Sequence, residues 1–182
     1  MKRIILIIAT ALIATAALAQ PRAIGGYLNL FGAEGFGVSY QHTLNDKMFA
    51  EADAMFSYDY GYTLGGWASV VVNYIFAKPE WLAFADMNAY AGIGLAGGWV
   101  GDALCTGVWY DYGISQSWGG GMVGPQLSLG IEANMDFGLS ISLDMKPIFG
   151  AHFNRYLYRN PVGLYKDGLM MFCPGIGVRY KF

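Results

Sequence analysis

The stretch that decides the fold runs from Glu34 to Leu44 and reads EGFGVSYQHTL. Large apolar or ring-bearing residues fill every second position, beginning with Phe36, Val38 and Tyr40. Glycine, serine, glutamine and threonine fill the positions between them. A two-residue period of this kind predicts a β-strand with one apolar face and one small or polar face.

The same alternation recurs along the chain and predicts eight strands. Clusters such as Asn45-Asp46-Lys47 and Asp136-Phe137-Gly138 predict tight turns between them. The longest connectors, 101–120 and 154–168, fall on one side of the predicted sheet, whereas 77–86 is long for a turn on the other side. The expected strands are 23–31, 34–44, 48–58, 62–76, 87–100, 121–135, 139–153 and 169–182.

The first nineteen residues predict a secretory signal peptide. Lys2 and Arg3 precede an apolar run, and Ala17-Leu18-Ala19 offers the small-x-small pattern of a cleavage site. We therefore expect residues 1–19 to be removed and 20–182 to form one domain. Without the two basic residues of the leader, nine basic residues remain against thirteen acidic ones, and this balance gives no reason to expect nucleic acid as a partner.

The composition favours a membrane barrel. The chain is 55% hydrophobic and only 13% charged, yet no apolar run after the leader is long enough for a transmembrane helix. Only a closed barrel then satisfies all backbone polar groups in lipid. The predicted fold class is all-β, an eight-stranded antiparallel up-and-down transmembrane β-barrel.

The small and polar face predicts the lining of a narrow lumen. It carries charges of both signs, which can pair there and plug the barrel. A soluble barrel such as a lipocalin would instead bury the apolar face, and the other face carries too few charges to solvate a barrel of this size. The predicted lumen charge network comprises Glu51, Asp53, Glu132, Asp144, Lys146 and Arg179.

The last eight residues read GIGVRYKF, with Val178, Tyr180 and Phe182 on the apolar face. This ending resembles the C-terminal assembly signal of outer-membrane barrels, and 143–147 and 130–132 are similar to small barrels of the OmpX and OmpA-transmembrane-domain type. The resemblance implies recognition by the barrel-assembly machinery and a bacterial outer-membrane location, in a Gram-negative cell. It implies little about activity, because fold does not determine function.

Three prolines and two cysteines do not follow the simple pattern. Pro125, Pro147 and Pro174 lie inside expected strands, where each removes a hydrogen-bond donor, so we expect bulges or local kinks. Cys105 and Cys173 either form a disulfide or remain free thiols, since exported chains permit pairing but the fifth and eighth strands are not neighbours.

No catalytic, cofactor or metal site is expected. His42 and His152 belong to strand ends at opposite sides of the barrel, whereas metal ligands converge. Ser142 and Asp144 share the strand of His152 but lie ten and eight residues from it, so no nucleophile–base pair stands out.

Three function classes remain open. The preferred hypothesis is a structural or loop-presenting barrel with a plugged lumen, in contact with outer-membrane lipid and monomeric. Tyrosines and tryptophans in its long outer loops are candidates for contact with an unidentified extracellular ligand. The alternative is a narrow, porin-like conduit or a binder for a small solute, and a lipid-modifying enzyme is the least favoured class.

Overall fold

The structure, a computed structural model, describes residues 21–30, 35–58, 64–100, 120–153, 162–171 and 174–182. Within these ranges no helix is long and apolar enough to cross a membrane. The strands are β1 (Arg22–Asn29), β2 (Gly35–Asn45), β3 (Met48–Tyr58), β4 (Leu64–Ala77), β5 (Ala85–Val100), β6 (Gly120–Met135), β7 (Leu139–Met145), β8 (Ile148–Phe153), β9 (Val162–Met171) and β10 (Pro174–Lys181).

The first of two apparent strand breaks separates β7 from β8. Both pair with β6 in one unchanged register, from Asn134 opposite Ser140 to Gly121 opposite Phe153. The assignment lapses only around Pro147, which has no N–H to donate. Strands β7 and β8 therefore form one long strand.

The second apparent break lies between β9 and β10, where residues 172–173 are outside the described ranges. The register that places Pro174 opposite Met145 also places Met171 opposite Ile148. Counted this way, the ten assigned segments make eight antiparallel strands, as the alternation predicts.

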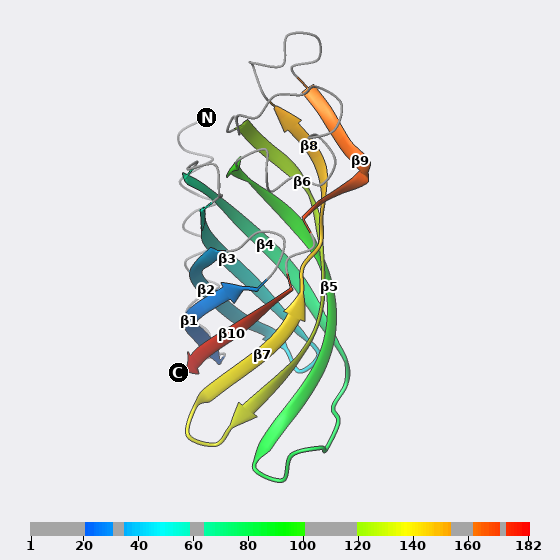
Figure 1. Cartoon of the computed structure of the whole chain (residues 1–182). Coiled ribbons are helices and arrows are strands. Elements are labelled where there is room, and N and C mark those ends of the chain that lie inside the picture. Colours follow the sequence, from blue (N-terminus) through cyan, green and yellow to red (C-terminus); the bar gives the residue numbers. More distant parts are fainter. Residues whose placement is uncertain (1–20, 31–34, 59–63, 101–119, 154–161, 172–173) are drawn as a thin grey trace, which may run out of the picture.

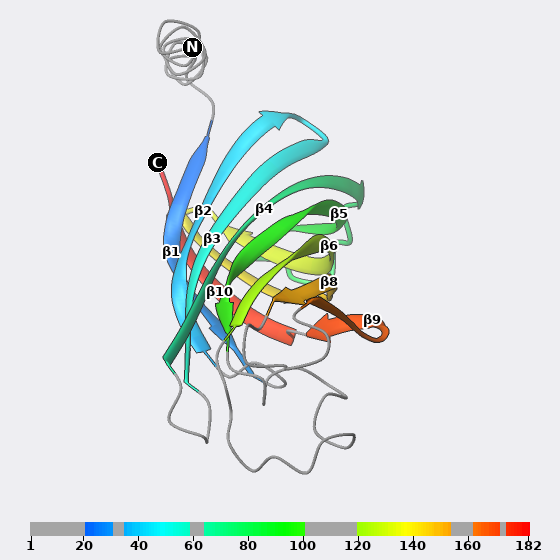
Figure 2. The ribbon, with the colours of Figure 1, turned by 90° about the horizontal axis from the view of Figure 1, so that it is seen from above.

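The sheet closes on itself. Each of the eight strands pairs antiparallel with the strand before it and the strand after it. Strand β5 pairs with β6, and β10 returns to pair with β1. Figure 1 shows the tilted strands in sequence order, and Figure 2 shows the ring from above, with β10 beside β1. The predicted eight-stranded up-and-down barrel is confirmed.

The structure corrects one local expectation and part of another. The eighth strand begins at Val162 in β9 rather than near residue 169, so the preceding connector is shorter than expected. Pro125 and Pro147 cause no bulge against the facing strand, because the register of β6 against β7 and β8 does not shift, but the pairing of β8 with β9 does shift between Ile148 and Phe149, directly after Pro147. Each proline is accommodated by the loss of one ladder bond, and Pro174 is the first residue of its strand, where proline is tolerated.

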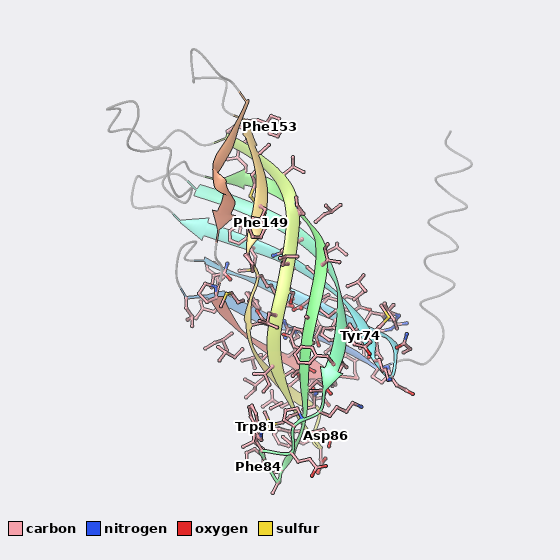
Figure 3. All side chains as sticks on the ribbon, turned by 90° about the vertical axis from the view of Figure 1, so that its right-hand side faces the viewer. Tyr74, Trp81, Phe84, Asp86, Phe149 and Phe153 are labelled. Atoms are coloured by element: carbon pink, nitrogen blue, oxygen red, sulfur yellow. The ribbon has the colours of Figure 1, made fainter. Side chains whose placement is uncertain are left out.

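The two faces of the strands differ as the alternation predicts. Figure 3 shows side chains projecting outward from the wall, with Trp81 and Phe84 at one end of the barrel and Phe153 at the other. The exposed large apolar residues of the wall include Ile24, Leu28, Phe36, Val38, Phe56, Val70, Val72, Tyr74, Phe76, Ile93, Leu95, Val123, Leu127, Leu129, Ile141, Leu143, Val178 and Tyr180.

Glycines on the inner face leave space for large side chains opposite them. A Cβ on Gly175 would lie 2.6 Å from Cε1 of Tyr27, and a Cβ on Gly130 would lie 2.8 Å from Cζ of Tyr90. Both tyrosines are buried. Alternation of small and large residues is how a barrel of eight strands fills its narrow interior.

Candidate functional site: the charged layer of the lumen

Lys146 is the centre of the buried charges in the lumen. It directly follows β7, and its side chain is 2% exposed. Its Nζ lies 3.0 Å from Oε1 of Glu51 and 2.7 Å from Oδ2 of Asp53, both on β3. The ammonium group also lies 4.0 Å from the ring centroid of Tyr27, within the range of a cation–π interaction. Strand β3 is thus tied across the lumen to the end of β7.

Arg179 of β10 forms a second tie to β3. Its Nη2 contacts Oε1 of Glu51. Its Nε donates to Oγ of Ser39 at 2.9 Å, and its Nη1 donates to Oγ of Ser142 at 2.8 Å. The serine hydroxyls in turn donate to Glu51 at 3.1 Å and to Asp144 at 3.2 Å. The guanidinium therefore has charged and hydroxyl acceptors on three strands, and charge-assisted bonds of this kind are the stronger ones in proteins.

Asp144 of β7 receives two tyrosine hydroxyls. Tyr27 of β1 donates to Oδ1, and Tyr90 of β5 donates to Oδ2 at 2.9 Å. The carboxylate lies 3.9 Å from Nζ of Lys146. The tyrosines supply hydrogen bonds that help replace the water lost on burial.

Every strand of the barrel contributes to this layer. Asn73 of β4 donates to Oε2 of Glu51 at 3.4 Å, and Gln126 of β6 reaches the carbonyl oxygen of Lys146 at 3.5 Å. We call the charged group Glu51, Asp53, Asp144, Lys146 and Arg179 the central cluster. Its three carboxylates face two cations, so its formal charge is −1 when all five groups are ionised. The cluster extends across the lumen rather than along one wall.

Five of the six residues of the expected network meet in the central cluster, and Glu132 lies apart from it. Glu132 contacts Lys181, with 3.6 Å between Nζ and Oε1, and the lysine side chain is 32% exposed. Tyr27 and Tyr90 lie on the small and polar face of the alternation but are not among the residues of the predicted network. Their signal was available: each is a large hydroxyl-bearing residue among inward glycines.

Of the two histidines and two cysteines, only His42 has a described side chain. His42 stacks beside Tyr40, with 3.4 Å between its Nδ1 and the tyrosine hydroxyl. The side chain of His152, together with Cys105 and Cys173, lies outside the description, so the disulfide prediction stays open. Among the described residues no group of three or more potential ligands could hold a metal ion.

The C-terminal residues are paired through their backbone. Phe182 donates its N–H to the carbonyl of Arg22 at 2.8 Å and accepts from the Arg22 amide at 3.1 Å. Its ring is 66% exposed, and Tyr180 and Val178 also face outward. The side chains of the predicted assembly signal are therefore free for contact from outside the barrel.

Comparison with known proteins identifies the architecture. No protein-family model matches this chain, and no curated protein matches it. Among solved structures, it is similar to the N-terminal β-barrel domain of Pseudomonas aeruginosa OprF, with a TM-score of 0.61. The fold is that of an OprF-like barrel. The likeness covers 90% of this chain and 98% of the other at 16% identity, so it establishes the fold alone.

Proposed function

We propose that this chain is a bacterial outer-membrane barrel with a closed lumen, which acts as a structural element and presents its long loops outside the cell. The outward apolar surface supports the membrane location. An outward row such as Val70, Val72, Tyr74 and Phe76 on β4 would be costly to expose to water. In lipid the same row is favourable, and the closed ladder leaves few backbone groups unpaired.

The central cluster carries the proposal that the lumen is closed. An eight-stranded barrel has an interior just wide enough for side chains. Here Lys146 and Arg179 fill it from the β7 and β10 side and pair with Glu51 from β3. Passage of a hydrated ion past these residues would require several buried hydrogen bonds and ion pairs to separate.

Conductance across a planar bilayer tests the closed lumen. The refolded mature protein should shift its mobility between unheated and boiled samples on an SDS gel, and should then give no steady single-channel current. A large porin in the same bilayer is the positive control. Folding with a stable current above the lipid background would replace the closed barrel with the conduit hypothesis.

One observation favours the conduit or solute-binding alternative. The described residues provide no hydrogen-bond partner for Oδ1 of Asn73, Oε1 of Gln126 or Oγ of Ser128, although all three atoms are buried. Such groups commonly bind water. A chain of lumen water would allow slow passage of small solutes, which liposome swelling with solutes of graded size would detect.

The remaining parts of the proposal concern export, assembly and activity. Mass spectrometry of the exported protein should give a mature chain that begins at Gln20. We further propose recognition of Val178, Tyr180 and Phe182 by the barrel-assembly machinery, and a monomer in the membrane. We propose no enzymatic role. Oγ of Ser142 donates to Asp144, but that carboxylate also accepts from two tyrosine hydroxyls and lies 3.9 Å from Nζ of Lys146, and these contacts stabilise its charged form and weaken it as a base.

A further inference from the structure

The ladder between β6 and β8, called here the β6–β8 seam, lacks bonds at two successive positions. Leu127 donates its N–H to the carbonyl of Pro147 at 3.0 Å, but Pro147 cannot return the bond. Hydrogen-bonded pairs recur at every second residue of an antiparallel ladder. The unchanged register therefore directs the backbone nitrogen of residue 125 toward the carbonyl of Phe149, and residue 125 is also proline.

One position on the inner face of this seam has no side chains to pack across it. Gly124 and Gly150 lie opposite each other, and a Cβ on either would come within 2.7 Å of the other's Cα. No pair of side chains can therefore pack across the seam at this position, although such pairs are a main source of sheet stability. The other edge of β6 differs, because it pairs with β5 along the whole of that strand.

The hairpin of β8 and β9 depends on this seam. Among the described strands β9 pairs only with β8, and its register shifts twice within their pairing. Figure 1 shows the two strands rising together at one end of the barrel. Apart from the β6–β8 seam, chain continuity through Lys146–Pro147 and into β10 attaches the hairpin to the wall.

Lys146 holds the base of this hairpin. It lies immediately before Pro147, and its ion pairs with Glu51 and Asp53 attach that point to β3. Ile148, the first residue of β8, is fully buried in the lumen. If β8 moved away from β6, Ile148 would leave the lumen. The ion pairs of Lys146 would keep the hinge in place.

The lumen wall is apolar at the level of Met122, beside the outer part of the seam. One row of opposed residues runs from Met55 on β3 through Trp67 and Gly98 to Met122 on β6. Met55, Trp67 and Met122 are buried. On the outer face of the same seam, Val123 and Leu127 are exposed. An apolar chain would therefore find apolar surface on both sides of the opening.

We propose that the β8–β9 hairpin is a flap that separates from β6, hinged at Lys146–Pro147, and that the opening admits an acyl chain from the surrounding lipid to the lumen beside Trp67. This inference rests on the proposed membrane location. The opening lies in the barrel wall. It therefore does not depend on whether the path along the barrel axis is closed at Lys146.

Amide hydrogen exchange along β6 tests the flap. The amides compared are neighbours on one strand, so they lie at nearly the same depth in the membrane. Gly121 and Val123 direct their N–H groups toward β8, in phase with Leu127, whereas Met122 and Gly124 direct theirs toward β5. In the full mature protein in lipid nanodiscs, we expect Gly121 and Val123 to exchange about tenfold faster than Met122 and Gly124.

The variant Pro125→Ala/Pro147→Ala supplies both missing donors and should abolish this difference by slowing exchange at Gly121 and Val123. A gel-mobility shift verifies that the variant is folded. Equal protection of all four amides in the wild-type protein, or unchanged exchange in the variant, would overturn the flap. Failure of the wild-type chain to fold into any bilayer would instead overturn the proposed membrane location.

Quenching by lipid brominated on its acyl chains tests what the opening admits. A variant that retains Trp67 as its sole tryptophan should be quenched in the wild-type background and clearly less in the Pro125→Ala/Pro147→Ala background. A variant that retains only Trp99, which faces outward, should be quenched equally in both. Trp67 fluorescence that is insensitive to brominated lipid in both backgrounds would overturn entry of the acyl chain.

Discussion

Replacement of Lys146 with methionine, which removes the charge with little change in volume, should be among the most destabilising lumen substitutions. The ammonium group is 2% exposed and has carboxylate oxygens at 2.7, 3.0 and 3.9 Å. Without it, three carboxylates face the single guanidinium of Arg179. Removal of one partner of a buried ion pair costs about 3–5 kcal/mol, because the other charge stays buried without compensation. We expect a loss in this range for Lys146→Met.

The matched control is Lys181→Met. Lys181 also pairs with a lumen carboxylate, Glu132, but at 3.6 Å and with its own side chain 32% exposed. Only the lysine end of this pair reaches solvent, since the Glu132 side chain is 4% exposed, so we expect its removal to cost about 1 kcal/mol, less than that of Lys146. The two variants remove the same functional group from the same barrel, so the difference between them reports burial and geometry.

The assay is reversible urea unfolding in lipid vesicles, followed by tryptophan fluorescence, with gel mobility as a check of folding. A second variant, Lys146→Met/Asp53→Asn, removes one of the uncompensated carboxylates and should recover about 1–3 kcal/mol relative to Lys146→Met alone. If Lys146→Met unfolds within about 1 kcal/mol of Lys181→Met, the central cluster is not the stabilising element described here.

Three further predictions, two of them with a control variant, test other parts of the structure. Gly175→Ala would drive a Cβ against the Tyr27 ring and should cost about 1–3 kcal/mol by urea unfolding, whereas Gly26→Ala, whose Cβ would find its nearest atom 4.0 Å away, should cost less than about 1 kcal/mol. Ile93→Arg on the outer wall should cost about 2–4 kcal/mol in bilayers, and Phe137→Arg in the β6–β7 turn about 0–1 kcal/mol; equal costs would contradict a lipid-facing wall. Phe182→Ala should leave unaided refolding in detergent within about 0.5 kcal/mol of wild type, because its ring is 66% exposed, yet should reduce the amount of barrel inserted in cells. Normal insertion of that variant would remove Phe182 from the assembly signal.

Much of the architecture is predictable from local pattern. The period of two assigns each side chain to a face without knowledge of its partners, because successive residues of a strand point in opposite directions. It therefore placed Glu51, Asp53 and Asp144 in the lumen. It also predicted the strand from 139 to 153 that β7 and β8 together form.

The alternation could not predict which inward residues meet. Glu51 and Arg179 are 128 residues apart, and only the closure of β10 on β1 and the tilt of the strands bring them together. Glu132 occupies the same face as the central cluster, but it lies elsewhere along the lumen, beside Lys181. Face assignment depends on neighbouring residues along one strand, whereas position along the barrel depends on the register of all eight.

The prolines show most clearly which properties the sequence determines and which the pairing of the strands determines. The sequence by itself determined that Pro125 and Pro147 each lose a ladder bond, because neither has an N–H. Only the tertiary structure decided that both losses fall on the β6–β8 seam, because the register sets these residues two positions apart on facing strands. The chemistry of a single residue can be read from the sequence. Which residues it meets is set by the pairing of the strands.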